Sequence, residues 1–483
     1  MRSVAAAVAA AWLPCAAAAA QDGDAVQRTE QRLRLLDAQY RSDVPPGAGA
    51  GDRFRLDAGG SAQLGLYSID DDESESHVLR QWDGRAWAHA RLDATHSFFG
   101  RLKFRYDDWN SGDDFDGQGD DLREPLGERW WYQFAPGGRR GGAGGGAGWD
   151  LSFKAGKQFV HWGEGLALSE ALIAAVVEAE WNGLALDLLA GETPANDFVD
   201  FDTSRPSFDT NTKRRFLGAL LEWRGGGVTP FAHVLRQIDR NDRDFALFVD
   251  GLGQLYPTSF EYDSTYYGAG ARGSLGARTS WRAELGFETG RGQSSPVDAN
   301  GAPGPQTEED VCAWAFAGGL TRLFLDERRT RADFELIAAS GDDDRLDSAD
   351  TFGGNLSATD DTAWNAFGFV NTGLALAPEP SNLVTVRIGA ATSPWAGRGG
   401  EIGRLRAVVD GFLFLKIDPD APLNVATTGH RFVGGEIDVG FDWNLLSDVA
   451  LAFRYGLFMP GPAMPDGQDG ARQILYGSVT YAF

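Results

Sequence analysis

The last twelve residues of the chain, 472–483 (RQILYGSVTYAF), decide the class of fold. Counting back from Phe483 in steps of two gives one apolar set, Tyr481, Val479, Gly477 and Leu475, while Ser478 and Thr480 fall on the opposite face. A period of two indicates a β-strand with one apolar and one polar side. Because a strand needs neighbours and earlier segments repeat the pattern, this stretch is predicted to close a β-barrel. The alternative is the edge strand of a soluble sandwich.

The same alternation begins at Arg53 and continues to the end of the chain. In its first segment the apolar face consists of Phe54, Leu56, Ala58, Ala62, Leu64 and Leu66. Several segments alternate for about ten residues or more, which is longer than a usual sandwich strand and matches a tilted membrane strand. The opposite faces carry Arg, Lys and Glu, which must point at water rather than lipid. The pattern therefore predicts a barrel with a wet lumen.

Short turns and long polar gaps alternate between these segments. Short turns are expected at 182–183, 224–227, 276–278 and 444–448, and long polar gaps at 107–128, 191–214, 237–263 and 291–310. Asn-Gly at 182–183 is a favoured hairpin dipeptide. Short periplasmic turns opposite longer, acidic extracellular loops are typical of an outer-membrane barrel.

The number of candidate strands is nineteen, whereas a single-chain bacterial barrel with both ends in the periplasm needs an even number. We place 362–376 in a long outer segment, 341–381, that folds into the lumen. The competing assignment removes 404–416 instead. The prediction is an all-β fold: a transmembrane antiparallel up-and-down β-barrel of about 18 strands, wide enough for an aqueous channel.

Residues before the barrel divide into two parts. Residues 1–20 have a charged start, an apolar run and an Ala-x-Ala end, which predict a secretory signal peptide and export to the outer membrane of a Gram-negative bacterium. Residues 21–52 contain an amphipathic helix over 24–41 and a linker, which would lie in the periplasm and offer a site for a periplasmic partner. The barrel is expected over 53–483. After the signal is removed, Cys312 is the only cysteine, so no intramolecular disulfide is possible.

The chain is acidic, with 44 Lys and Arg against 69 Asp and Glu and a formal charge of −25. Nucleic acid is excluded as a partner because its phosphates would be repelled. Acidic clusters at 70–73, 113–116, 342–344 and 360–361 fall in polar gaps, where they are expected to be solvated loop tips. Ca²⁺ binding is the alternative, but no cluster has an ordered ligand spacing, so no metal site is predicted.

Two motifs resemble signatures of the alginate export family of outer-membrane channels. The first is Gly156-Lys157-Gln158-x-x-x-Trp162-Gly163-Glu164-Gly165, in which Lys157 replaces the usual Arg. The second combines Gly434-Gly435-Glu436-Ile437-Asp438 with Phe458-Met459-Pro460-Gly461. The terminal Phe483 is also similar to the assembly signal of bacterial outer-membrane barrels. The resemblance implies a monomeric, eighteen-stranded channel, which in some members exports an anionic exopolysaccharide.

Charged residues on the inward faces are the candidate site. The expected substrate and lumen lining consists of Arg101, Lys103, Arg105, Lys154, Gln158, Arg272, Arg282, Arg387 and Arg454. Arginine binds carboxylate-bearing solutes bidentately, and Arg101, Lys103 and Arg105 are predicted to form an anion-selective constriction. Glu284, Glu436 and Asp438 are expected to be structural lumen carboxylates, the last two paired with arginines of neighbouring strands. The alternative for most of these charges is pairing across the wall, which would hold the lumen rigid.

Catalysis is not expected. The six histidines are scattered and none stands in a hydrolase or metalloprotease motif, so the chain is predicted to be no enzyme and to need no cofactor. The prediction is an outer-membrane channel for polar solutes, including export of an anionic exopolysaccharide such as alginate. The alternatives are a general or nutrient-uptake porin and a non-conducting scaffold or adhesin. Expected partners are outer-membrane lipid, lipopolysaccharide and a polar or polyanionic saccharide.

Overall fold

The computed structural model describes residues 54–483, apart from 71–74, 115–118, 137–148, 197, 242–244, 250–254, 299–301, 303 and 346–354. The predicted signal peptide (1–20) and the predicted helix and linker (21–52) lie outside the described residues. No helix in the described ranges is long and apolar enough to cross a membrane.

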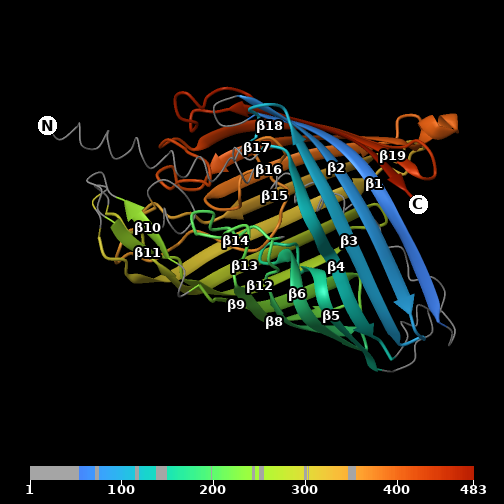
Figure 1. The fold of residues 1–483 in the computed structure, drawn as a ribbon, viewed down its shortest axis with the longest axis horizontal. Helices are drawn as coiled ribbons and strands as arrows, with labels where there is room; N and C mark the ends of the chain where they lie inside the picture. Colours follow the sequence, from blue (N-terminus) through green and yellow to red (C-terminus); the bar gives the residue numbers. More distant parts are fainter. Residues whose placement is uncertain are drawn as a thin grey trace.

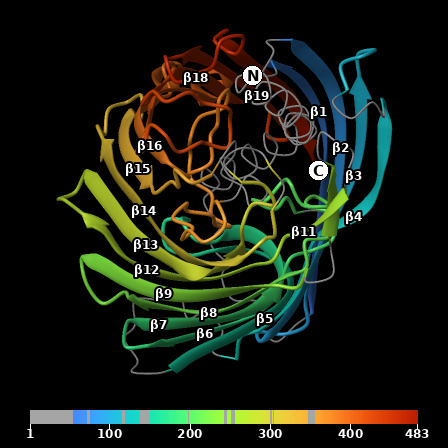
Figure 2. The ribbon, with the colours of Figure 1, turned by 90° about the vertical axis from the view of Figure 1, so that its left-hand side faces the viewer.

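The described residues form one closed, 18-stranded antiparallel sheet, in which every strand pairs with its neighbours in the sequence (Figures 1 and 2). The strands of the first half are β1 (Arg55–Asp70), β2 (Ser76–Arg91), β3 (His96–Trp109), β4 (Asp121–Phe134), β5 (Trp149–His161), β6 (Ser169–Trp181), β7 (Leu184–Glu192), β8 (Arg214–Trp223) and β9 (Val228–Asp239). Those of the second half are β12 (Tyr262–Ser274), β13 (Thr279–Gln293), β14 (Glu308–Leu323), β15 (Arg331–Ala339), β16 (Leu383–Thr392), β17 (Leu405–Lys416), β18 (Phe432–Asn444), β19 (Val449–Pro460) and β20 (Arg472–Ala482). The prediction of an eighteen-stranded barrel is confirmed.

Four short elements lie outside the barrel wall. β10 (Phe245–Val249) and β11 (Leu255–Ser259) form a separate hairpin at one end of the barrel. The short 3₁₀ helices η1 (Ala396–Arg398) and η2 (Glu401–Arg404) lie between β16 and β17.

The seam between the last and first strands closes the wall. β20 pairs with β1 from Ser61 opposite Ala482 to Ile69 opposite Ile474. Phe483 continues the pairing, because its N–H donates to the Gly60 carbonyl at 3.0 Å and the Gly60 N–H donates to its carbonyl at 2.9 Å. The closing role predicted for the C-terminal stretch is therefore confirmed.

Alternation along each strand separates a lipid-facing side from a lumen side. In β3, Leu102 and Phe104 are 50% and 45% exposed on the outside, whereas Lys103 and Arg105 between them are buried inside. In β20, Val479 and Tyr481 point outward, and Tyr476 points inward. A charged side chain in contact with hydrocarbon is costly, so the polar face must be the inner one.

The two ends of the barrel differ. One end, called here the short-turn end, carries connections such as 92–95, 182–183, 224–227, 275–278, 324–330 and 445–448, as well as the longer 393–404. The opposite, long-loop end carries 110–120, 193–213, 240–261, 294–307, 340–382, 417–431 and 461–471. The alternation is not strict: 71–75 and 162–168, at the long-loop end, are short, and 135–148, at the short-turn end, is long.

Residues 362–376 are not a wall strand. They belong to the connection between β15 and β16, residues 340–382, whose described parts, 340–345 and 355–382, fold inside the ring of strands (Figure 2). Residues 405–416 form β17 instead, so the preferred of the two strand assignments is correct. The apolar residues of 362–376 are buried against inward side chains of the wall, which removes them from water without a place in the sheet.

Candidate functional site

Two segments fold into the barrel and narrow it. One is the inward turn, residues 162–168, and the other is the inserted segment, residues 340–382. Leu168 and Phe367 form a parallel bridge between them. The Ser169 N–H donates to the Phe367 carbonyl and the Phe369 N–H to the Gly165 carbonyl, both at 2.8 Å. The two segments therefore form one constriction inside the lumen.

Carboxylates of the wall hold this constriction through backbone N–H groups. Glu284 accepts the Glu164 N–H at 2.5 Å, and Glu288 accepts the Asn365 N–H at 3.1 Å. Glu436 accepts three consecutive N–H groups, from residues 374, 375 and 376, at 2.5, 2.8 and 2.9 Å. A hydrogen bond of this kind is stronger when the accepting carboxylate is ionised than when it is neutral. All three glutamates are almost fully buried.

Two glycines allow the backbone to approach these carboxylates. Gly163 has φ +60° and Gly373 has φ +92°, values that L side chains rarely adopt. A Cβ at Gly163 would lie 2.4 Å from a Glu284 oxygen, and one at Gly373 would lie 2.6 Å from a Glu436 oxygen. The Trp-Gly-Glu-Gly motif of the sequence therefore builds the inward turn.

Aromatic packing fills the space between the constriction and the wall. Trp364 and Phe367 are buried among inward residues that include Phe216 and Tyr266. A cavity of about 100 Å³ remains on the long-loop side, lined by Glu170, Asp200, Phe201, Phe367 and Phe369 among others. Side chains of the inward turn and the inserted segment therefore fill one half of the lumen.

The wall formed by β2, β3 and β4 carries a cationic strip on its inner face. Its five cations are Arg85, Arg101, Lys103, Arg105 and Arg123, and its four carboxylates are Asp83, Asp107, Asp121 and Glu128. Arg101 lies 2.6 Å and Arg85 lies 3.2 Å from Glu128. Cations exceed carboxylates in this strip, so its formal charge is positive.

The residues of the strip differ in what they present to the lumen. The Lys103 side chain is 4% exposed beside Asp83 at 3.5 Å, and that of Arg105 is 7% exposed beside Asp107 at 2.7 Å. Arg101 is 24% exposed and Arg123 is 40% exposed. All three residues predicted to form the constriction lie on the inner face of β3. Two of them are held deep in ion pairs, so Arg101 and Arg123 are the accessible charges.

On the opposite wall, acidic and basic side chains alternate in a row that begins at the inward turn and crosses β13, β15, β16 and β17. The row consists of Glu164, Arg282, Glu335, Arg387 and Asp410, and the nitrogen–oxygen distances between successive members are 3.0, 2.6, 2.9 and 3.0 Å. Arg282 and Arg387 are therefore engaged on both sides by carboxylates. This arrangement corresponds to the predicted alternative of pairing across the wall.

The other predicted lining residues are dispersed. Arg272 pairs with Glu222 at 2.6 Å and Arg454 with Asp442 at 2.6 Å. The Lys154 ammonium lies 4.7 Å from the centre of the Trp131 ring. Gln158 is buried and donates to the Ala174 carbonyl at 2.9 Å. The fold does not bring these four together with the cationic strip into one cluster of contacts.

The pairing expected for two of the lumen carboxylates is wrong. Glu436 binds backbone N–H groups of the inserted segment rather than an arginine. Asp438, beside it on the same face of β18, is also buried, and its Oδ1 has no partner within the described part of the chain. Glu284 accepts from His233 at 2.8 Å and from the inward turn. The inserted segment supplies these partners, and strand alternation does not reveal it.

Sequence reasoning did not identify every residue and contact of the site. Arg85 and Asp83 stand on the inner face of β2, and the alternation of that segment could have found them. Glu288 was expected on an inward face, but its contact with Asn365 and that of Glu164 with Glu284 join residues 77 and 120 positions apart, so no local pattern signals these contacts.

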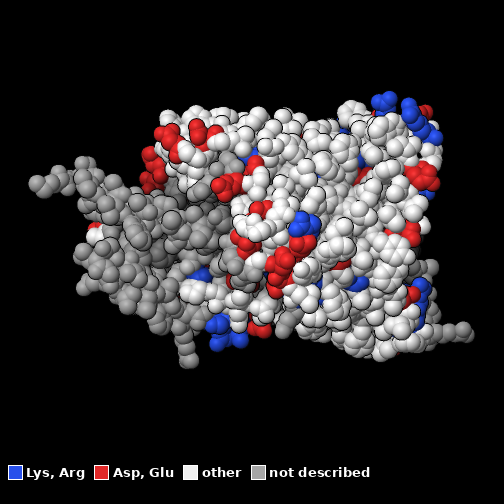
Figure 3. Space-filling view, turned by 45° about the horizontal axis from the view of Figure 1, so that its top comes forward, with Lys and Arg blue, Asp and Glu red and all other residues white. Residues whose placement is uncertain are grey.

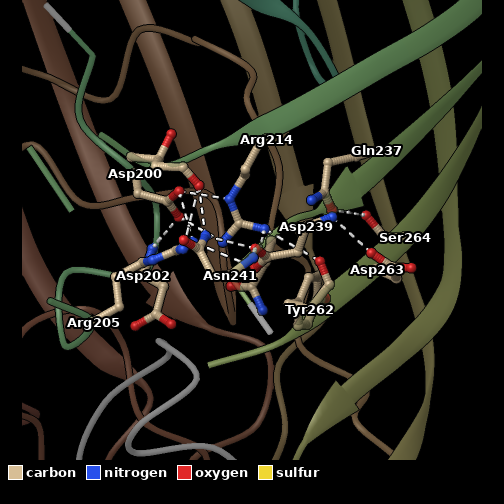
Figure 4. Close-up of polar contacts among 12 residues, drawn as sticks. Asp200, Asp202, Arg205, Arg214, Gln237, Asp239, Asn241, Tyr262, Asp263 and Ser264 are labelled. Atoms are coloured by element: carbon tan, nitrogen blue, oxygen red, sulfur yellow. Dashed lines mark hydrogen bonds and ion pairs between the residues drawn. The ribbon is translucent and has the colours of Figure 1, made fainter. Parts of the chain in front are cut away.

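A buried ionic network ties a long loop to the wall (Figure 4). Arg214, at the start of β8, lies 2.5 Å from Asp200 and 3.2 Å from Asp239, and Arg205 lies 3.2 Å from Asp200. The Arg214 guanidinium also lies 4.6 Å from the centre of the Phe201 ring. Asp200 and Arg205 belong to the loop 193–213, so this network fixes that loop over the packed half of the barrel.

Among the acidic clusters, residues 342–344 bring three carboxylates within 4.8 Å of one another. Burial raises the pKa of Asp342 to about 6, with the charge of Asp361 adding to the effect. Asp342 already accepts the N–H groups of Asp344 and Thr362, both at 2.9 Å. These contacts are those of a loop held by its own backbone.

Three solved structures report the same architecture. OccK11 (OpdR) of Pseudomonas aeruginosa has a TM-score of 0.53 and 13% identity, over 90% of this chain and 98% of that one. OccAB1 of Acinetobacter baumannii has a TM-score of 0.52 and 10% identity, over 91% and 99%. OccK7 (OpdD) of Pseudomonas aeruginosa has a TM-score of 0.51 and 12% identity, over 89% and 98%. No family model and no curated protein matches the chain.

The fold therefore defines the class: an outer-membrane β-barrel with the fold of a porin channel. The neighbours are Occ and Opd porins, and nothing points specifically to the alginate export family that the two motifs resemble. The Gly-rich motifs are accounted for by the inward turn and the bend at Gly434, which has φ +152°.

We predict that Arg214→Ala strongly destabilises the barrel. The substitution leaves Asp200 and Asp239 buried without their main cation, which costs about 3–5 kcal/mol. The matched control is Arg215→Ala, the next residue, whose pair with Glu192 at 3.7 Å is about half exposed and contributes at most about 1 kcal/mol. Urea unfolding followed by tryptophan fluorescence measures both. Equal losses in the two variants would contradict the structural role of the network.

We predict that anion preference rises on acidification through Glu164, which lies in the inward turn rather than in a strand. Burial raises the pKa of Glu164 to about 7, and Arg282, which lowers it, opposes that effect. Protonation between pH 8 and pH 6 removes one negative charge from the lumen. The reversal potential under a KCl gradient should therefore shift toward anion selectivity at pH 6. Glu164→Gln should abolish this pH-dependent shift. An unchanged pH response in that variant would reject the assignment.

Proposed function

We propose that the chain is an uptake porin that passes small polar solutes and prefers anions. The observation that carries the proposal is the cationic strip on β2–β4, where five cations lie among four carboxylates. A narrowed, low-dielectric passage strengthens the effect of this charge on a passing ion. Arg101 and Arg123 are the side chains that a carboxylate-bearing solute would meet.

The constriction favours small solutes over a polymer. The inward turn and the inserted segment are held by Glu284, Glu288 and Glu436 and packed by Trp364 and Phe367. A polysaccharide would have to thread past both segments. Export of an anionic exopolysaccharide such as alginate is therefore the weaker candidate, and the uptake porin, first considered as the alternative, has the better support.

The other candidate functions are a non-conducting scaffold or adhesin and an enzyme. A non-conducting scaffold or adhesin would give no ionic current in planar bilayers, which distinguishes it from a porin. The solved structures that share this fold are porins and not enzymes, which agrees with the prediction of no catalysis. The predicted periplasmic partner of residues 24–41 falls outside the described residues and stays a prediction, as do the lipopolysaccharide contact and the saccharide solute.

We predict that Arg101→Gln together with Arg123→Gln reduces anion selectivity. Both side chains are exposed to the lumen, and the double variant leaves Lys103, Arg105 and Arg85 against four carboxylates, which makes the formal charge of the strip negative. Single-channel reversal potentials under a salt gradient should shift toward cation selectivity.

The control for this experiment is Arg215→Gln with Arg291→Gln. These two arginines point away from the lumen and form exposed pairs with Glu192 and Glu308. Their removal should leave the reversal potential unchanged. A wild-type channel that is cation-selective, and unmoved by the lumen double variant, would overturn the anion preference but not the porin fold.

We predict that Glu436→Ala loosens the constriction. The change removes an acceptor of three backbone N–H groups, each worth about 1.5–3 kcal/mol when the acceptor is charged. Single-channel conductance should rise and show more frequent fluctuations. Glu192→Ala, an exposed outward glutamate, is the control and should behave as the wild type. Unaltered conductance in the Glu436 variant would mean that the inserted segment does not limit flow.

A further inference from the structure

Arginines gather at one part of the short-turn end, although the chain as a whole is strongly acidic. We define the arginine rim as Arg322, at the end of β14, and five arginines in the turns after β12, β14 and β16: Arg278, Arg328, Arg329, Arg398 and Arg404. All six are exposed. In Figure 3 a group of blue side chains stands at the upper corner of this end of the barrel. Only three carboxylates, Asp326, Glu327 and Glu401, belong to the same turns.

The rim is distinct because its arginines lack close ionic partners within the described part of the protein. No ion pair links any of the six arginines to a described carboxylate. The Arg322 guanidinium donates to the Thr279 hydroxyl at 2.7 Å. Asp326 is occupied within its own turn, where its carboxylate accepts the Thr330 N–H at 2.7 Å and the Thr330 hydroxyl at 2.6 Å. These hydrogen bonds hold the pKa of Asp326 below its ordinary value, and the charge of Arg328 adds a smaller effect in the same direction.

The turns of the rim form one fixed surface. The Ser393 N–H donates to the Arg328 carbonyl at 2.7 Å, and the hydroxyls of Thr330 and Thr392 lie 3.2 Å apart. The Trp443 indole donates to the Glu401 carbonyl at 2.9 Å, which attaches the turn after β16 to the wall. The six charges are therefore presented together rather than on independent loops.

The rim lies next to the lipid-facing band of the wall. Leu323, Phe324 and Leu325 are large apolar residues that stay exposed beside Arg322, and Ile402 is exposed beside Arg404. Arg322 itself points outward, on the same side of β14 as Leu320. Apolar side chains next to arginines fit the boundary between hydrocarbon and headgroups, where the long side chains reach phosphate. Among the acidic clusters of the long-loop end, Asp343 and Asp360 are exposed.

We propose that the arginine rim binds the headgroup phosphates of anionic phospholipids in the periplasmic leaflet. The short-turn end of an outer-membrane barrel faces that leaflet. A phosphodiester supplies the close ion-pair partner that the six arginines do not have among the described carboxylates, and the guanidinium fork matches its oxygens. The neighbouring apolar residues contact the acyl chains of the same lipid.

The test compares lipids that share acyl chains and differ in headgroup. Purified full-length protein in detergent is titrated with phosphatidylglycerol and with phosphatidylcholine, and bound lipid is measured by native mass spectrometry. The wild type should bind phosphatidylglycerol more tightly. The variant Arg328→Gln, Arg329→Gln, Arg398→Gln, Arg404→Gln should lose about tenfold or more of that affinity, since each interfacial arginine contributes to anionic lipid binding. Glycerophosphoglycerol without acyl chains should bind far more weakly than the lipid.

The matched control neutralises four exposed arginines of the long-loop end: Arg215→Gln, Arg240→Gln, Arg291→Gln and Arg431→Gln. It should bind phosphatidylglycerol as the wild type does. Equal binding of the two lipids, or equal loss in the two variants, would overturn the rim as a lipid site. Binding of the soluble headgroup as tight as that of the lipid would overturn the assignment to a membrane lipid. Conductance and selectivity of the rim variant should be unchanged, so failure here is separate from failure of the porin proposal.

Discussion

Closure of the sheet is the constraint on which the rest of the structure depends. Within hydrocarbon no water can satisfy a backbone N–H or carbonyl, so each strand must have a partner on both sides. The pairing of β20 with β1 removes the last free edges, and Phe483 extends that pairing to the end of the chain through two hydrogen bonds with Gly60. Once the wall is closed, the alternation of each strand fixes which side chains meet lipid and which meet water.

Inside the wall, charge serves two different purposes. On β13 and β18, buried glutamates accept backbone N–H groups and hold the inward turn and the inserted segment in place. On β2–β4, cations and carboxylates lie in contact but in unequal numbers, and Arg101 and Arg123 are the more exposed of the cations. The first arrangement builds the constriction, and the second makes the inner face of β2–β4 positive in formal charge.

The sequence predicted the wall well because strand alternation is a local property. It also predicted that one candidate strand had to leave the wall, since both ends of the chain must lie on one side, and residues 362–376 do leave it. The prediction for the site was less complete. The inner face of β3 was identified, but the partners of Lys103 and Arg105, the depth at which they are buried, and the roles of Glu164 and Glu288 depend on contacts between distant segments.

By itself the sequence determined the class of fold. Apolar and polar residues alternate with a period of two over some four hundred residues, and a closed barrel places the apolar face against lipid and the polar face against water. The sequence determined likewise which residues face inward. Only the tertiary structure decided which of those residues a solute can reach. That outcome depends on where the inserted segment lies against the wall, and its contacts join residues more than sixty positions apart, such as Leu374 with Glu436 and Asn365 with Glu288. No periodicity encodes such a contact, since it arises from packing inside a space that exists only after the barrel has closed.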